Sequence, residues 1–380
     1  MIYLDNSATS FPKPPEVIEA VAEALAAPAS PGRSGHAASL NASRSIHKAR
    51  KGVARLFGIK DNSRIVFTCN ISWALNIALE GLRLKQGDHV ISSSLEHNSV
   101  ARPLARMAAA RGIIWDQAPI DSNGLTDPQE FRKLLRPTTK LVAMTHASNV
   151  TGALLPVKEV KALIGDIPIV LDAAQTAGAI PMEDVTTWAD IVTFTGHKGL
   201  MGPTGTGGLW VRPGLELRPL AVGGTGSRSE SLRQPDFLPD ALEAGTPNTH
   251  GLAGLAAGLD VVLKTGVDRI REHEMNLTMR FLDGLGSIPG LQVQGPTKRE
   301  QRVSTISVTI DGWSSSDLSA ALEADYGILT RSGLHCSPLS HQFLGTFPGG
   351  TTRFSIGLYN LAEDVDTSVK ALEVLAAGKR

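Results

Sequence analysis

Short apolar runs alternate with longer amphipathic stretches through the middle of the chain, between Ile65 and Val211. The apolar runs are rich in β-branched residues and several end in glycine or polar residues, which is typical of buried strands. They are RIVFT, HVISSS, LVAMTHAS, PIVLD, DIVTFTG and GGLWVR. This alternation predicts an α/β fold with a mostly parallel sheet covered by helices on both faces. Functional side chains are then expected at the carboxyl ends of the strands.

The flanking regions predict a second, smaller unit. Before the alternating region, residues 41–58 place apolar residues at helical spacing, with Asn41 or Ser43 as the expected helix cap. After it, residues 224–248 form a polar stretch long enough for a functional loop. Residues 249–285 are helical in pattern, and STISVTID, SSDLSAALEADYG, TTRFSIGLYN and DVDTSVKALEVLAAG then predict a small α+β unit. We expect an N-terminal arm (1–14) joined to the small domain, a large domain (15–255) and a small C-terminal domain (256–380).

Composition narrows the class of protein. The 380 residues suit a large domain plus a smaller one, and 37 basic residues balance 37 acidic residues, giving a formal net charge of zero. No polybasic run is present, so nucleic acid and anionic membranes are not expected partners. No apolar run is long enough to span a bilayer, and MIYLDNSATS lacks the layout of a secretory signal, so a cytoplasmic protein is expected. Two cysteines, Cys69 and Cys336, are too few for a disulfide framework.

Two strand ends carry complementary chemistry. Lys198 follows the run DIVTFT in a glycine-rich loop, and Asp172 with Gln175 follows the run PIVL. An isolated loop lysine is most often a solvated cation. A pyridoxal phosphate site, however, needs at least two groups: an amine that forms a Schiff base and a carboxylate that keeps the pyridinium nitrogen protonated. Lys198 and Asp172 are of these two types.

Other strand ends offer further polar groups. Ser72 lies at a strand-to-helix turn, where backbone N–H groups can meet a phosphate, although an ordinary capped helix explains the same residues. His97 and Asn149 follow two more strands, where an imidazole can stack or move protons and an amide can donate to a ring hydroxyl or a carboxylate. Thr195 and His197 flank the same turn as Lys198. A structural histidine and a turn asparagine are the alternative interpretations, and no metal site is expected.

The two cysteines have different surroundings. Cys336 lies in the turn LTRSGLHCSPLSH beside His335 and Arg331, neighbours that favour the thiolate, although a packed thiol is an equal alternative. Cys69 has no nearby cation in the sequence and is expected to be packed.

These segments together resemble the cysteine desulfurases and selenocysteine lyases, a group of class V aminotransferases with the fold-type I pyridoxal phosphate fold. The resemblance rests on the order and spacing of YLDNSAT, EHNS, HASNVTG, LDAAQTAG, FTGHKGLMGPTG, EAGTPN, RSGLHC and RFSIGLYN. It covers nearly the whole chain.

The resemblance implies a role for each of these positions. Lys198 would form the Schiff base, Cys336 would be the nucleophile and His97 would stack on the ring and move protons. Arg353 would bind the substrate carboxylate with Asn149 nearby. The cofactor would be held by Ser72, His97, Asn149, Asp172, Gln175, Thr195, His197 and Lys198, and by Thr246 of the neighbouring subunit, which implies a homodimer with shared active sites. The implied reaction converts L-cysteine to L-alanine through a persulfide on Cys336, whose sulfur passes to a small thiol or an acceptor protein.

The sequence also departs from the pattern of this group. Asn70, Ile71, Ser72 and Trp73 stand where relatives commonly carry a Gly-Thr-Thr-Glu type of turn, so one phosphate hydroxyl is missing, and Leu334 stands where relatives often carry a second histidine. The short connection before Cys336 resembles that of desulfurases with a short loop. A selenocysteine lyase, an aminotransferase, an epimerase and a sulfur-transfer scaffold without turnover remain as alternatives.

Overall fold

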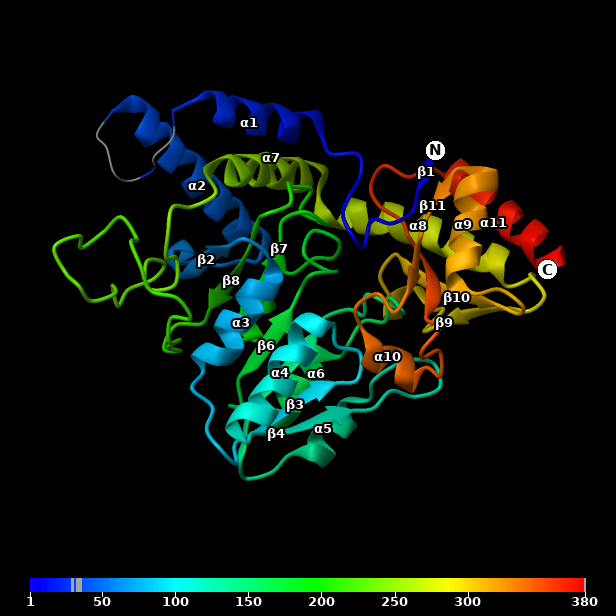
Figure 1. Ribbon diagram of the computed structural model, residues 1–380, viewed down its shortest axis with the longest axis horizontal. Coiled ribbons are helices and arrows are strands. Elements are labelled where there is room, and N and C mark those ends of the chain that lie inside the picture. The colour runs from blue at the N-terminus through cyan, green and yellow to red at the C-terminus, as the bar shows by residue number, and fades with distance from the viewer. Residues whose placement is uncertain (29–30, 32–35, 379–380) are drawn as a thin grey trace.

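The computed structural model describes residues 1–28, 31 and 36–378. Its largest element is a seven-stranded sheet with strand order β2-β8-β7-β6-β5-β3-β4 (Figure 1). Strands β4, β3, β5, β6 and β7 run parallel, while β8 is antiparallel to both β7 and β2. The predicted α/β fold with a mostly parallel sheet is therefore confirmed. The strands are β2 (Ile65–Thr68), β3 (His89–Ser93), β4 (Ile114–Ala118), β5 (Thr139–Thr145), β6 (Ile169–Asp172), β7 (Ile191–Thr195) and β8 (Gly207–Val211).

Both faces of this sheet are buried, which explains why its strands lack polar alternation. Along β6, Val170 packs into one apolar cluster, while Ile169 and Leu171 pack into another on the opposite face. The first cluster includes residues of α3 (Ile71–Gly81) and α4 (Asn98–Arg111). The second includes residues of α2 (Ala37–Leu56), α5 (Pro128–Leu134), α6 (Val157–Ile164) and α7 (Thr249–Thr265). Short 3-10 turns lie at Asn62–Arg64, Val185–Thr187 and Arg299–Gln301.

The expected cap of the helix before β2 is wrong. Helix α2 begins at Ala37, and His36 is its N-cap, with Nδ1 accepting from the Ser39 N–H at 3.2 Å. Asn41 and Ser43 lie inside the helix, where the Ser43 hydroxyl donates to the Ser39 carbonyl at 3.1 Å. The helix begins further toward the N-terminus than expected, and the His36 imidazole nitrogen satisfies one of its free N–H groups, that of Ser39.

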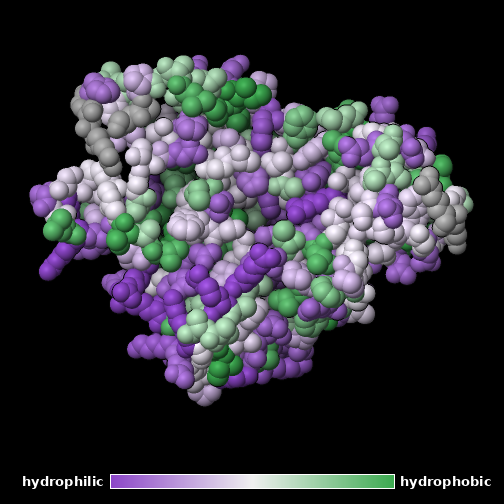
Figure 2. All heavy atoms as spheres, in the orientation of Figure 1, coloured by the Kyte–Doolittle hydropathy of each residue, from purple (hydrophilic) through white to green (hydrophobic). Residues whose placement is uncertain are grey.

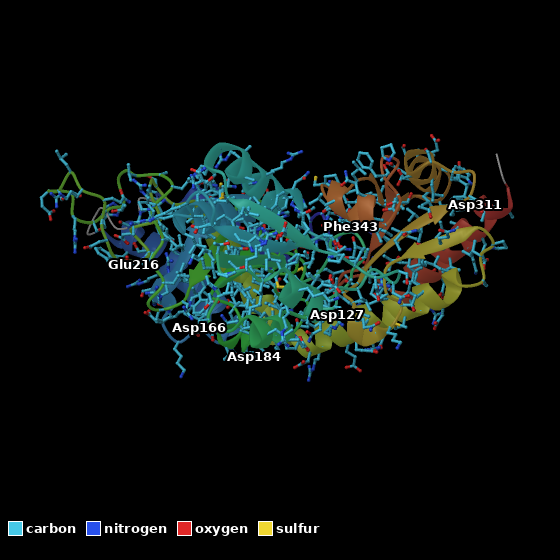
Figure 3. The ribbon with its side chains drawn as sticks, turned by 90° about the horizontal axis from the view of Figure 1, so that it is seen from below. Asp127, Asp166, Asp184, Glu216, Asp311 and Phe343 are labelled. Carbon is cyan, nitrogen blue, oxygen red and sulfur yellow. The ribbon has the colours of Figure 1, made fainter. Side chains whose placement is uncertain are left out.

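A four-stranded antiparallel sheet of order β12-β13-β10-β9 forms the second unit, on the side of the molecule where Figure 3 labels Asp311 and Phe343. Its core joins Phe281, Val308, Phe354 and Leu372. The predicted strands β10 (Thr305–Ile310) and β13 (Thr351–Ser355) and helices α9 (Ser315–Tyr326) and α11 (Ala362–Ala377) are present. The sequence pattern missed β9 (Leu291–Gln294), β12 (Arg331–Gly333) and α10 (Pro338–Phe343).

The N-terminal segment and a long helix pair link the two units. Strand β1 (Ile2–Tyr3) pairs with β11 (Ile328–Leu329), and Asp5 forms a bridge with Ser355. Helix α7 continues without a break past residue 255, the expected end of the large domain, and is followed by α8 (Val267–Leu285). The domain limits expected from the sequence stay a prediction.

Helix α1 (Pro15–Ala26) packs along α7 and leaves an apolar strip on the surface. It exposes Ile18 and Leu25, and hydrophobic residues gather over it along the upper edge of Figure 2. Within the described residues, no helix has the length and apolar character needed to cross a membrane.

Candidate active site

A cavity of about 220 Å³ lies where the carboxyl ends of β3, β5, β6 and β7 face β12 and β13 of the smaller sheet. Side chains far apart in the sequence meet there because parallel strands deliver their carboxyl ends to one edge. Most of the predicted site residues line this cavity: Ser72, His97, Asn149, Asp172, Gln175, Thr195, His197, Lys198 and Arg353. Cys336 and Thr246 are not among the lining residues.

Asp172 ends β6 and is 3% exposed. The Ala174 N–H donates to its Oδ1 at 2.8 Å, and no hydrogen bond to Oδ2 is present within the described residues. Burial raises the pKa of the Asp172 carboxyl, while the Ala174 N–H and the nearby Lys198 ammonium oppose that rise. A buried carboxylate is costly without a cationic partner. The open side of Asp172 therefore fits a protonated ring nitrogen.

Lys198 follows β7 and reaches the same cavity. Two close backbone approaches bring its loop against the loop after Asp172: a Cβ on Gly178 would lie 2.4 Å from the Gly199 carbonyl oxygen, and a Cβ on Gly199 would lie 2.5 Å from the Ala177 oxygen. Burial lowers the pKa of the Lys198 amine to about 8, with Arg353 and Arg331 adding to the effect and Asp172 opposing it. With a pKa of about 8, roughly a tenth of this amine is neutral at pH 7, and the neutral form is the nucleophile.

Polar groups without partners gather at the start of α3. Asn70 caps this helix by accepting from the Trp73 N–H at 2.9 Å, which leaves the N–H groups of Ile71 and Ser72 without partners in the described part of the chain. The Thr195 hydroxyl and the His197 Nδ1 atom are buried and also unpartnered. These groups converge on the positive end of the helix dipole. They fit a phosphate group. The Ile71 side chain has no hydroxyl to offer such a group, but its backbone N–H is available as a donor.

His97 is both the N-cap of α4 and a wall of the cavity. Its Nδ1 accepts from the Ser99 N–H at 3.0 Å, so in the neutral ring the proton lies on Nε2. Burial, together with Lys198, Arg331, Arg353 and Arg102, lowers the pKa of His97 to about 4. The imidazole is therefore neutral near pH 7 and presents an N–H donor. The Ser99 hydroxyl lies 2.9 Å from Nδ1 and 2.6 Å from the Ser72 hydroxyl, and it links two predicted residues.

Two arginines project from opposite positions of β12 and β13. Arg331 and Arg353 are cross-strand partners and both line the cavity. Arg353 is 1% exposed; its Nη2 contacts Asp5 Oδ1 at 2.7 Å and its Nη1 donates to the Asn149 carbonyl at 3.1 Å. Its Nε has no partner in the part of the chain that the structure describes, so the guanidinium still offers a donor toward a carboxylate.

Cys336 lies in a turn beside Arg331, whose Nη2 is 3.5 Å from the thiol sulfur. His335 and Cys336 both have positive φ, 48° and 59°, which is strained for residues with side chains. Three hydrogen bonds hold this turn: Asn98 N–H to the Cys336 carbonyl (2.7 Å), Asn149 Nδ2 to the His335 carbonyl (2.7 Å) and Ser337 Oγ to Asn149 Oδ1 (2.8 Å). The thiol is exposed, which excludes the packed alternative for Cys336. One amide N–H of Asn149 remains for a ligand.

Thr246 and Cys69 lie in a different cavity, of about 450 Å³, which Trp73 and Asn248 also line. Thr246 therefore does not reach the cavity of Lys198 in its own chain. The expectation that Cys69 is packed is wrong for the single chain, because its thiol is exposed at the turn after β2. The β-strand ends there, and the side chain falls outside the core cluster formed by β2.

Two residues of the site carry no prediction from the sequence. Asp5, the partner of Arg353, lies in the segment YLDNSAT, and Ser99 lies in EHNS. Their positions in these two segments could have indicated that they belong to the site, because every other residue assigned to the site also falls in one of the segments that carry the resemblance or at a strand end.

Comparisons with known proteins place nearly the whole chain in a family. Residues 2–367 match the family model described as aminotransferase class-V. Probable cysteine desulfurases of Methanothermobacter thermautotrophicus and Pyrococcus abyssi are both 34% identical to the chain, over 99% and 100% of it and 94% and 95% of their own lengths. The apo structure of a cysteine desulfurase from Thermococcus onnurineus superposes with a TM-score of 0.93 at 34% identity, covering 99% of this chain and 95% of that one. A cysteine desulfurase of Escherichia coli gives 0.90 at 28%, covering 100% and 95%.

The sheet, the lysine loop and the buried aspartate define a pyridoxal phosphate-dependent enzyme of fold-type I. Within that class, the chain belongs to the aminotransferase class-V family.

Proposed function

We propose that this enzyme is a cysteine desulfurase that converts L-cysteine to L-alanine and retains the sulfur as a persulfide on Cys336. The observation that carries the proposal is the exposed Cys336 thiol, held in a strained turn beside Arg331 at a cavity that contains Lys198 and Asp172. An aminotransferase or an epimerase needs no thiol there. The names of the relatives at 34% identity support the same reaction.

The lining residues fit pyridoxal phosphate. The N–H groups at the start of α3, with Thr195 and His197, would hold the phosphate, and Asp172 would hold the ring nitrogen. When bound, the cofactor joins the substrate amine and takes up the electron pair left on the α-carbon.

Each side chain then has a separate task. The neutral amine of Lys198 takes the α-proton, and the unpartnered Nε of Arg353 donates to the substrate carboxylate. The Cys336 thiolate attacks the substrate sulfur: an S–S bond forms on Cys336 and the carbon–sulfur bond of the substrate breaks. His97 Nε2–H is placed to give a proton in the steps that lead to alanine.

The position of Thr246 supports a homodimer with shared sites. Thr246 lies in a cavity outside its own active site, on a surface that also carries the exposed Trp73. A second subunit on this face would bring Thr246 to its partner's phosphate. The exposed Cys336 would pass its sulfur to an acceptor thiol or protein, in the cytoplasm.

The direct test is to incubate the cofactor-loaded enzyme with L-cysteine, quantify alanine and measure the mass of the Cys336 peptide. Alanine formation with a gain of one sulfur atom on that peptide is expected. No alanine would overturn the proposal. Cleavage of L-selenocysteine by a Cys336→Ala variant, with no activity on L-cysteine in either protein, would instead identify a selenocysteine lyase, because selenium leaves without help from the thiol.

A further inference from the structure

A second, smaller cavity lies behind Lys198. Its volume is about 40 Å³, which is room for about three water molecules. Lys198, Ser7 and Gln175 line both this cavity and the larger one, and the Gln175 amide donates to the Ser7 carbonyl at 3.2 Å to form part of the wall between them. Lys198 therefore has access to two compartments, of which only the larger one can hold cofactor and substrate.

Glu274 of α8 faces this small cavity. It is 8% exposed, and the Ser304 hydroxyl donates to its Oε2 at 3.0 Å. Glu274 and Lys198 are the only ionisable side chains among the described residues that line the cavity. Burial raises the pKa of Glu274 to about 7, while Ser304 and Arg271, one turn earlier on α8, oppose that rise. Arg302, the nearest cation in sequence before β10, donates instead to the carbonyls of Pro296 and Thr305.

In the proposed reaction the larger cavity leaves the Lys198 proton without an acceptor, because His197 is committed to the phosphate. Nδ1 of His97 already accepts from Ser99, and its Nε2 carries a proton, so His97 cannot take another near pH 7. Asp172 is the partner of the ring nitrogen in the proposed reaction. Once substrate fills the cavity, solvent water is displaced from this side of the lysine. The small cavity is the remaining route to a base.

We infer that Glu274 accepts the proton of the Lys198 ammonium, and later returns it, through water held in the small cavity. The inference rests on the proposed function. An N–H bond of Lys198 breaks with its electron pair staying on Nζ, a water molecule takes that proton and releases one of its own, and an O–H bond forms on the Glu274 carboxylate. The return reverses each step, so no other reactant is consumed.

The test compares Glu274→Gln, which keeps the size and a hydrogen-bonding group but cannot accept a proton, with Glu272→Gln, an exposed position on the same helix. In the loaded enzyme, kcat for L-cysteine should fall by about tenfold to 100-fold in Glu274→Gln, with KM unchanged. In the wild type, kcat should decrease below about pH 7 as Glu274 becomes protonated, and Glu274→Gln should lack this decrease. Glu272→Gln should match the wild type. An unchanged kcat and pH profile in Glu274→Gln would overturn the inference while leaving alanine formation, and the proposed function, intact.

Infrared difference spectroscopy gives a readout that is independent of turnover. Adding L-cysteine to the loaded enzyme should change the carbonyl band of a protonated carboxyl, and Glu274→Gln should lack that change. If Glu274→Gln does not fold, Ser304→Ala serves instead: without the hydroxyl donor, the pKa of Glu274 rises and the acid limb of kcat moves to higher pH. An acid limb that stays in place in Ser304→Ala, or a band unaffected by L-cysteine in the wild type, contradicts the inference.

Discussion

The two walls of the active-site cavity are built in opposite ways. The wall formed by the large sheet carries polar groups that have no partner among the described residues, such as the Thr195 hydroxyl at the end of β7 and the His197 Nδ1 just after it. The wall formed by β12, β13 and the Cys336 turn is instead held by partners from elsewhere in the chain: Asp5 pairs with Arg353, and Asn149, which follows β5 of the large sheet, bonds to the turn. Nε of the Arg353 guanidinium is left there without a partner in the described part of the chain. The first wall therefore suits a permanently bound cofactor. The second wall holds in position the side chains proposed to act on the substrate, Arg353 and Cys336.

The first prediction removes the function of both walls at once. Lys198→Ala should abolish covalent attachment of the cofactor and reduce alanine formation by at least roughly 10³-fold, because the amine is both nucleophile and base. The visible absorption band of the lysine-bound cofactor and an alanine assay measure the two losses. Lys161, which pairs with Asp190, provides a matched control as Lys161→Ala. Normal turnover in Lys198→Ala would exclude the assignment of this lysine.

The second prediction distinguishes cofactor binding at the first wall from sulfur transfer at the second. Cys336→Ala should keep the visible band and the cofactor affinity but lose release of sulfur from L-cysteine by at least roughly 10³-fold, since only the thiolate attacks the substrate sulfur. Cys69→Ala is the control, because Cys69 is the other exposed thiol and lies in a separate cavity. Desulfuration that survives in Cys336→Ala and fails in Cys69→Ala would reverse the roles assigned to the two cysteines.

The sequence predicted the first wall better than the second. Asp172 and Lys198 each follow an apolar run, so the rule for parallel strands was enough to bring them together. The partner of Arg353 could not be predicted in the same way, because Asp5 lies 348 residues away and reaches β13 through pairing of the N-terminal segment. The helix cap at His36 was missed for a local reason: histidine is an uncommon cap. The positive φ of Cys336 depends on three tertiary hydrogen bonds that no local pattern encodes.

The third prediction concerns substrate binding at the second wall alone. Arg353→Lys keeps a positive charge but loses the planar fork that bonds Asp5, Asn149 and the substrate carboxylate together. KM for L-cysteine should rise roughly 10- to 100-fold, with the visible cofactor band retained. Steady-state kinetics with Arg233→Lys, an exposed position, as the control would measure the effect. A loss of the band with an unchanged KM would place Arg353 in the cofactor site instead.

The fourth prediction tests whether the unpaired groups await a phosphate. Thr195→Val removes a buried hydroxyl that has no partner, so the apoprotein should be as stable as the wild type or about 1 kcal/mol more stable, while pyridoxal phosphate binds roughly tenfold more weakly. Thr193→Val on the same strand is the control: its hydroxyl donates to the Leu171 carbonyl at 2.8 Å, so that variant should lose stability and keep the affinity. Equal cofactor affinity in Thr195→Val and the wild type would remove Thr195 from the phosphate site.

The last prediction concerns Glu96, which lies outside both walls and affects stability instead of activity. Its Oε1 accepts from the Thr145 N–H at 3.0 Å, and its Oε2 is buried with no partner among the described residues. Burial raises the pKa of Glu96 to about 8. Because the folded chain binds this proton more tightly than the unfolded chain, the contribution of Glu96 to stability is complete below its unfolded pKa and is lost as pH rises through about 8. In Glu96→Gln, which carries no such proton, Tm should therefore fall less than in the wild type between about pH 5 and about pH 8.5. The exposed Glu159→Gln should follow the wild type, and an equal fall of Tm in all three proteins would mean that Glu96 is ionised in the folded chain at both ends of this range.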